Sequence, residues 1–191
     1  MGILILGLIL FLAAHSLRIV ADDWRTRQVA RLGEHRWKGV VSLASAVGLG
    51  LIVWGYGLAR LAPVVLWNPP LWTHHVTALL TVPAFILIAA AYVPGNRLRG
   101  AARGHPMVVG VKLWAFAHLL SNGTVADLLL FGGFLVWALF DFRSARRRGG
   151  VAVAGGGTGG RDALTAVAGL VAWAAFAFLL HGPLIGVRPF A

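Results

Sequence analysis

The sequence predicts an all-α fold, a polytopic bundle of about six transmembrane helices, and three observations favour it. The 191-residue chain is 59% hydrophobic and only 12% charged, with a mean hydropathy of +0.80. Soluble domains carry about twice that share of charged residues. Apolar stretches long enough to cross a bilayer recur along the chain, and basic residues gather in alternate links between them. The length suits a single membrane domain over 1–191.

The expected spans are apolar runs approaching the length of about 20 residues that a bilayer requires. They lie at 2–20, 40–62, 74–94, 107–121, 124–142 and 162–181. The fourth is short and follows Pro106, which suits a helix start because its missing N–H needs no partner there. Ser42, Ala46 and Gly50 lie four residues apart in the second span, a spacing that favours close helix contact.

The distribution of the basic residues predicts the topology. The chain has 17 Lys and Arg against 6 Asp and Glu, and the rich links are those after the first, third and fifth spans. The positive-inside rule places these links, including a Gly-rich loop at 149–161, in the cytoplasm and both termini outside it. A nucleic-acid surface would not alternate with spans. We therefore expect membrane lipid, and no nucleic acid, as a partner.

Missing motifs exclude several kinds of site. The chain has no cysteine, which excludes disulfides, thiolate metal sites and C-x-x-C-H haem attachment. It also lacks the G-x-S-x-G and H-E-x-x-H patterns of hydrolases. Any metal or haem must therefore be bound by His, carboxylate, Met or Tyr side chains.

Ionisable residues inside spans are costly and are functional candidates by default. The expected spans hold four that stand out: His15, Lys112, His118 and Asp127. Lys112 is interpreted as extending its amine to the cytoplasmic face. Asp127 suits the first turn of a helix, where the dipole favours a negative charge. His181, before Gly182 and Pro183, suits a helix end.

His15 and His118 are the candidate metal ligands. At 1.5 Å per residue, both fall within several Å of the membrane midplane, to order of magnitude, on spans that run in opposite directions. Two such histidines can ligate a haem iron from both sides. The alternative is that each only bonds a neighbouring helix. Spacing alone leaves both interpretations open.

A haem at this pair would need further groups. Phe11, Trp114 and Phe116 are expected to line its slot, and Arg18 or Lys112 to meet its propionates. Each imidazole should also have its other N–H engaged, because such partners orient metal-ligating histidines. The local candidates for that role are Ser16, Ser121 and Asn122.

His105, at the cytoplasmic mouth of the fourth span, is the candidate catalytic residue. It is expected to form a polar cluster with Arg103, and a histidine there could move protons near neutral pH. The alternative is that it caps the helix that starts at Pro106.

A long stretch of the sequence resembles the NnrU family. It runs over 105–123 as HPMVVGVKLWAFAHLLSNG, followed by Ala126-Asp127-Leu128 and Gly132-Gly133. The segments 103–106, 11–16 and 31–36 also resemble family motifs. The resemblance implies a bacterial inner-membrane protein tied to the expression or maturation of nitrite and nitric oxide reductases.

The NnrU family is also similar to zeta-carotene isomerase, a haem b membrane enzyme. That similarity implies that His15 and His118 are haem ligands, and it places Ala115 where the isomerase has a cysteine. Three functions stay open: a haem-binding accessory protein of denitrification, a cis-trans isomerase of an apolar, lipid-soluble polyene, and a structural membrane protein without cofactor. The sequence indicates no particular protein partner.

Overall fold

The protein is all-α, as predicted. A computed structural model describes residues 1–149 and 157–190, and the regular elements within them are helices. An isolated bridge pairs Val65 with Thr124 in this part of the chain. Most of the Gly-rich loop expected at 149–161 lies outside the described residues. The helices form two compact units, Met1–Val64 and Val65–Ala191, and each is described on its own.

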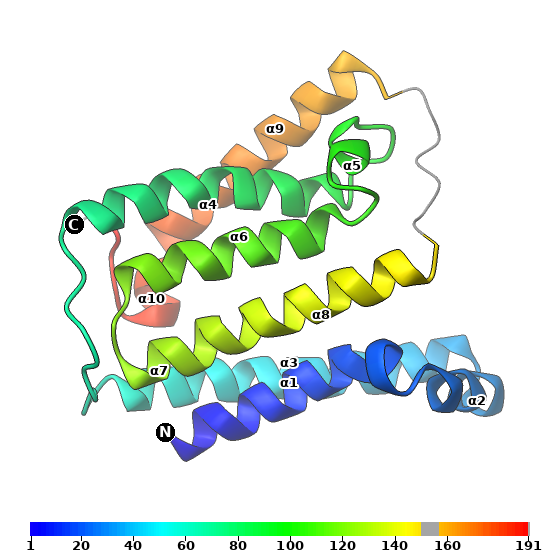
Figure 1. Cartoon of the computed structure of the whole chain (residues 1–191), viewed down its shortest axis with the longest axis horizontal. Helices are drawn as coiled ribbons and strands as arrows, with labels where there is room; N and C mark the ends of the chain where they lie inside the picture. The colour runs from blue at the N-terminus through cyan, green and yellow to red at the C-terminus, as the bar shows by residue number, and fades with distance from the viewer. Residues whose placement is uncertain (150–156, 191) are drawn as a thin grey trace. The chain divides into compact units, whose positions relative to one another are not determined.

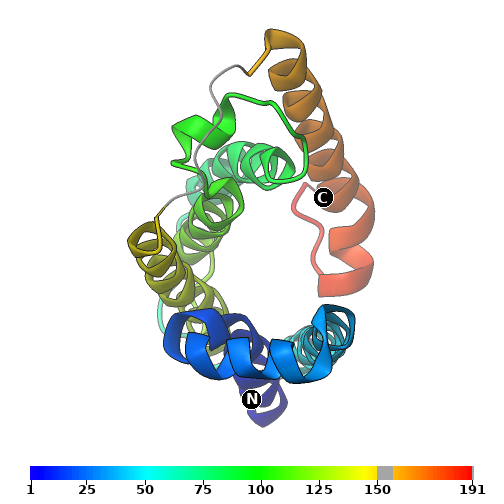
Figure 2. The same cartoon turned by 90° about the vertical axis from the view of Figure 1, so that its right-hand side faces the viewer.

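The first unit consists of two long apolar helices joined by a short basic one. α1 (Gly2–Val20) packs along α3 (Glu34–Ala59), and α2 (Asp22–Leu32) links them. Figure 1 shows α1 and α3 side by side, whereas α2 runs crosswise at their ends in Figure 2. Gly33 separates α2 from α3 with a φ of +79°, a conformation that favours glycine.

Glycines allow the close contact between α1 and α3. A Cβ on Gly7 would lie 2.6 Å from a backbone nitrogen of α3, and one on Gly48 would lie 2.9 Å from a backbone nitrogen of α1. The prediction of close contact at Ser42, Ala46 and Gly50 is wrong for this helix pair. Those three residues are exposed, and a Cβ on Gly50 would meet open space among the described residues.

The second unit is built around α4 (Trp72–Ala90), which contacts both α6 (Pro106–Ser121) and α9 (Gly159–Ala174). α6 also contacts α8 (Gly133–Arg147), so that α4, α6 and α8 follow one another in Figure 1. A Cβ on Gly110 would lie 2.7 Å from a carbonyl oxygen of α4. Small residues therefore allow close backbone packing in this unit too.

Two helices of the second unit contain a π-helical turn. α7 (Val125–Asp127) continues through η1 (Leu128–Gly132) into α8. α9 continues through η2 (Ala175–Leu180) into α10 (His181–Ile185). The expected helix end at His181 is therefore wrong. Pro183 lies in α10, and the continuous helix ends two residues later at Ile185.

The apolar helices define a multi-pass membrane protein. Within the described residues, five helices are long and apolar enough to span a membrane: Gly2–Val20, Glu34–Ala59, Trp72–Ala90, Val125–Arg147 and Gly159–Ile185. α6, which coincides with the fourth expected span, is apolar but has only 16 residues. Its length of about 24 Å is less than the hydrocarbon thickness of about 30 Å.

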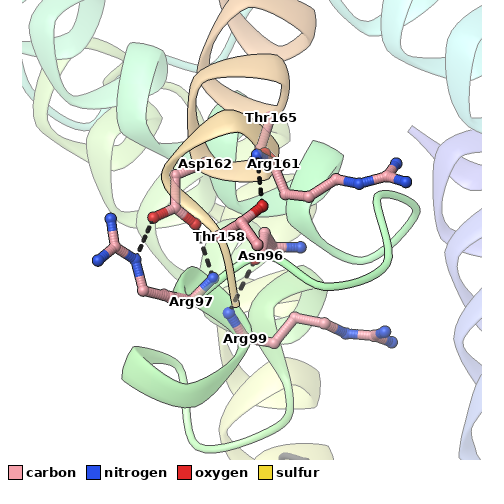
Figure 3. A network of polar contacts seen from close by, with 7 residues as sticks. All are labelled: Asn96, Arg97, Arg99, Thr158, Arg161, Asp162 and Thr165. Carbon is pink, nitrogen blue, oxygen red and sulfur yellow. Dashed lines mark hydrogen bonds and ion pairs between the residues drawn. The ribbon is translucent and has the colours of Figure 1, made fainter. Parts of the chain in front are cut away.

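A polar network joins the link after α4 to the start of α9 (Figure 3). The link also contains the short helix α5 (Leu98–Ala101). The Arg97 backbone N–H donates to Asp162 Oδ1 at 2.7 Å, and Arg97 Nε donates to Oδ2 at 2.5 Å. The Thr158 side chain caps α9, and Asn96 Oδ1 accepts the Arg99 N–H at 3.0 Å. These contacts hold the start of α9 against the link.

Candidate functional site

His15 in the first unit and His118 in the second have matching hydrogen bonds. Nδ1 of His15 lies 2.8 Å from the carbonyl oxygen of Phe11, and Nδ1 of His118 lies 2.9 Å from that of Trp114. A carbonyl oxygen only accepts, so Nδ1 carries the proton in each ring and the lone pair of the neutral imidazole is on Nε2. The prediction that each ring has an engaged N–H is confirmed. This tautomer suits metal ligation through Nε2.

The prediction that Ser16, Ser121 or Asn122 accepts these N–H protons is wrong. In both rings the Nδ1 proton goes to the carbonyl four residues earlier, because long side chains in a helix lean toward its N-terminal end. Ser16 is thus not the acceptor of this proton. Asn122 Nδ2 donates to the His118 carbonyl oxygen at 2.8 Å, and Ser121 Oγ accepts from the Thr77 hydroxyl at 2.9 Å. Asn122 and Ser121 therefore stabilise the end of α6.

Each imidazole also lies against a phenylalanine ring. The rings of Phe11 and His15 are stacked, with centroids 4.2 Å apart and 23° between planes. The rings of His118 and Phe131 are stacked at 4.6 Å and 25°. Trp114, whose ring centroid is 5.1 Å from that of His118, lies 5.2 Å from that of Phe131. Aromatic contacts thus restrict the orientation of both imidazoles.

Sequence reasoning missed Phe131. It belongs to η1, and the position of a side chain after a π-helical turn cannot be obtained from α-helical periodicity. Phe116, which was expected to line a cofactor slot, is instead 48% exposed. Being two residues from His118, it lies on a different face of α6.

The two cations expected to meet propionates have different surroundings. Arg18 lies one turn after His15 on α1 and is exposed. The ammonium nitrogen of Lys112 lies 3.8 Å from the centroid of the Phe142 ring, a cation–π contact. Lys112 is partly buried, and it lies six residues, or about 9 Å, before His118 along α6.

His105 is the N-cap residue of α6, but its side chain makes no capping hydrogen bond. The capping role considered for this side chain is therefore wrong, whereas the helix does start at Pro106. Nε2 of His105 is buried and has no hydrogen-bond partner among the described residues. The ring meets Phe142 edge-on, with centroids 6.1 Å apart. No hydrogen bond within the described chain joins His105 to Arg103, so the expected polar cluster is not formed.

Comparison with known protein families shows where the chain belongs. The family model described as NnrU protein matches residues 3–189, nearly the whole chain. The chain belongs to the NnrU family. Comparisons with curated proteins and with solved structures give no match.

Asp127 has a structural role in this NnrU-family chain. Its Oδ2 accepts from the backbone N–H of Thr124 at 2.8 Å and from the Thr124 hydroxyl at 2.7 Å. The Asp127 N–H donates back to Thr124 Oγ1 at 3.2 Å, which completes a capping box. The prediction that Asp127 lies in the first turn of a helix is confirmed.

Single histidines, rather than a cluster of ligating side chains, are the candidate ligands in this NnrU-family chain. The described residues contain no group of three or more His, Asp or Glu side chains able to hold a metal ion. A haem iron needs only axial ligands from the protein. The Nε2 lone pair of His15 and that of His118 are each chemically suited to act as an axial ligand.

Proposed function

We propose that this NnrU-family protein binds haem b through His15 and His118 in the bacterial inner membrane and supports denitrification. Its role there would be in the expression or maturation of nitrite and nitric oxide reductases. The observation that carries the proposal is the shared arrangement of the two imidazoles. Each donates its Nδ1 proton to its own helix and lies against a phenylalanine ring. The similarity to the haem b isomerase supports the same pair.

The lean of the two rings further supports the proposal. Each Nδ1 bonds a carbonyl four residues earlier, so each ring leans toward the N-terminal end of its helix. In the predicted topology α1 and α6 run in opposite directions across the membrane. Both histidines lie past the middle of their helices, so in this topology each ring would lean back toward the membrane midplane.

The chain's own residues would orient and isolate the haem. The Nδ1 hydrogen bonds fix the tautomer and raise the basicity of the ligating nitrogens. The Phe11 and Phe131 rings restrict rotation of the imidazoles, and the apolar spans exclude water. Arg18 and Lys112 remain the candidates to pair with the propionates. When bound, haem supplies one-electron chemistry or ligand binding.

An absorption spectrum tests haem binding. The protein should be purified after expression with ample haem supply. The wild type is expected to show a low-spin haem b spectrum, and His15→Ala and His118→Ala should each abolish or shift it. His35→Ala, in the first turn of α3, is the matched control and should leave the spectrum unchanged. A colourless wild type would overturn the proposal.

Complementation tests the role in denitrification. A denitrifying bacterium that lacks its NnrU-family protein should regain nitrite and nitric oxide reduction when it expresses the wild-type chain. Expression of the His15→Ala, His118→Ala double variant should not restore either activity. Full rescue by the double variant would show that the histidines serve another purpose.

A polyene isomerase is the second candidate function, since the family is similar to zeta-carotene isomerase. Ala115, fully buried in α6, stands where that enzyme has its cysteine, so a thiolate cannot replace His118 as ligand. The chain should be co-expressed with a pathway that makes a cis-polyene, and lipid extracts analysed by chromatography. An unchanged cis-to-trans ratio is expected, whereas a shift that depends on His118 would favour the isomerase.

A further inference from the structure

α2 is the helix between two candidate membrane spans. It joins the end of α1 to the start of α3, and both of those helices are long and apolar enough to span a membrane. Figure 2 shows α2 crosswise at these helix ends rather than continuing either one. None of its residues is buried. If α1 and α3 span the membrane, a helix in this position would have lipid headgroups as its neighbours.

One exposed face of α2 combines an aromatic ring with two arginines. Trp24, Arg27 and Arg31 follow at spacings of three and four residues, so they share a face, and all three are exposed. The Trp24 ring meets the edge of Trp37 in the first turn of α3, with centroids 5.8 Å apart and 71° between planes. This contact fixes α2 close to α3. Indole rings favour the membrane interface because they are amphipathic.

Among the described residues, the ion pairs near this face involve other side chains than its two arginines. Arg25 pairs with Asp22 at 3.9 Å, and Lys38 pairs with Glu34 at 2.7 Å. In the described part of the chain, no ion pair involves Arg27 or Arg31. A guanidinium presents a planar set of donors that matches the oxygens of a phosphate. The face therefore carries two positive charges suited to phosphate and a ring suited to the interface.

We propose that α2 is an interfacial helix whose face of Trp24, Arg27 and Arg31 binds the phosphates of anionic phospholipids. The partner is lipid rather than an acidic protein, because the spans on both sides hold α2 at the bilayer and Trp24 favours its interface. In the predicted topology this is the cytoplasmic leaflet. The inference does not depend on haem.

Lipid quenching of a single fluorophore tests the proposal. The chain has no cysteine, so Ala30→Cys, at an exposed position of α2, gives a unique labelling site. The full-length labelled protein should be reconstituted in phosphatidylcholine vesicles that contain increasing amounts of phosphatidylglycerol. In one series the phosphatidylcholine is brominated, and in the other the phosphatidylglycerol is brominated. The ratio of the quenching curves gives the preference for the anionic lipid. The test variant is Arg27→Gln with Arg31→Gln, and the control is Arg146→Gln with Arg147→Gln in α8.

The wild type and the control are expected to prefer phosphatidylglycerol, and the test variant to lose that preference about 30-fold, the equivalent of about 1 kcal/mol for each arginine. High salt should weaken the preference, because it screens exposed charges. Equal quenching by both lipids in the wild type would overturn the proposal. So would equal loss in both double variants, or a label that neither lipid quenches, which would place α2 away from the bilayer.

Discussion

The imidazole of His118 is held by contacts from two segments. Its Nδ1 bonds the Trp114 carbonyl within α6, and its face lies against Phe131 of η1. Hydrogen bonding fixes the tautomer, and stacking fixes the plane of the ring. Phe131 is therefore expected to be a positioning residue for a ligand at Nε2.

Phe131→Leu is expected to change the electron paramagnetic resonance g values of a low-spin haem, because these values depend on the plane of the axial imidazole. Phe134→Leu is the control, since Phe134 packs edge-on against Trp114, with centroids 5.6 Å apart. The ¹⁵N shifts of the His118 ring in haem-free protein provide a second measurement. If neither measurement distinguishes Phe131→Leu from the control, Phe131 does not orient the ring.

His105 gives a prediction about stability. A buried, unpartnered polar atom costs about 1–3 kcal/mol, so His105→Leu is expected to raise the apparent Tm of the purified protein. His105→Asn, which keeps a polar group, should not. If His105 also serves the function, the stabilised variant should lose haem content or complementation. A Tm that falls in His105→Leu would show that Nε2 is satisfied in the folded protein.

Side-chain roles followed from sequence only where the partner is local. The capping box of Thr124 and Asp127 could be expected from the helix start, because its partners are three residues apart. The pairing of Arg97 with Asp162 joins residues 65 apart, and no sequence pattern signals it. The stacking of Phe131 on His118 depends on the register change at η1, which propensity does not predict.

At the scale of helices, apolar runs predicted the elements, because a helix in lipid must satisfy its backbone within itself. Which face packs was harder to predict. Small residues at Ser42, Ala46 and Gly50 fit the expected spacing, but α1 packs instead on the face of α3 that carries Gly48 and Gly55. Both faces of a span are apolar, so hydropathy does not distinguish them.

Gly48→Ala and Gly50→Ala form a matched pair that tests this contact. Gly48→Ala is expected to destabilise the protein by about 1–3 kcal/mol, because the new methyl group would overlap the α1 backbone. Gly50→Ala should be neutral or stabilising by about 0.4–1 kcal/mol, since its methyl group would meet open space. Unfolding in detergent measures both. Equal effects would show that α1 and α3 do not pack through Gly48.

At the scale of the whole molecule, the distribution of charge predicts the orientation in the membrane. Basic residues flank the end of α1, the start of α3 and the end of α8, and they are sparse in the link between α3 and α4. Translocating arginine and lysine across the membrane is disfavoured, so the basic ends are predicted to stay in the cytoplasm. α6, with 16 residues, is shorter than the length of about 20 residues that a membrane span requires. If α6 did not cross, the C-terminus would lie on the opposite side from the N-terminus.

Single cysteines in the cysteine-free chain test this topology. Ala30→Cys and Ala101→Cys are expected to react with a membrane-impermeant maleimide only after the cells are permeabilised, because their links are basic and are predicted to be cytoplasmic. Ala62→Cys and Val187→Cys should react in intact cells. All four positions are exposed in the structure, so a failure to react reports the membrane side rather than burial. Suppose that Val187→Cys is labelled only after permeabilisation, whereas Ala62→Cys is still labelled in intact cells. The chain would then cross the membrane one time fewer than predicted, and we would infer that α6 does not span it. That result would also contradict the premise that α1 and α6 cross the membrane in opposite directions. The predicted shared depth of His15 and His118 depends on this premise.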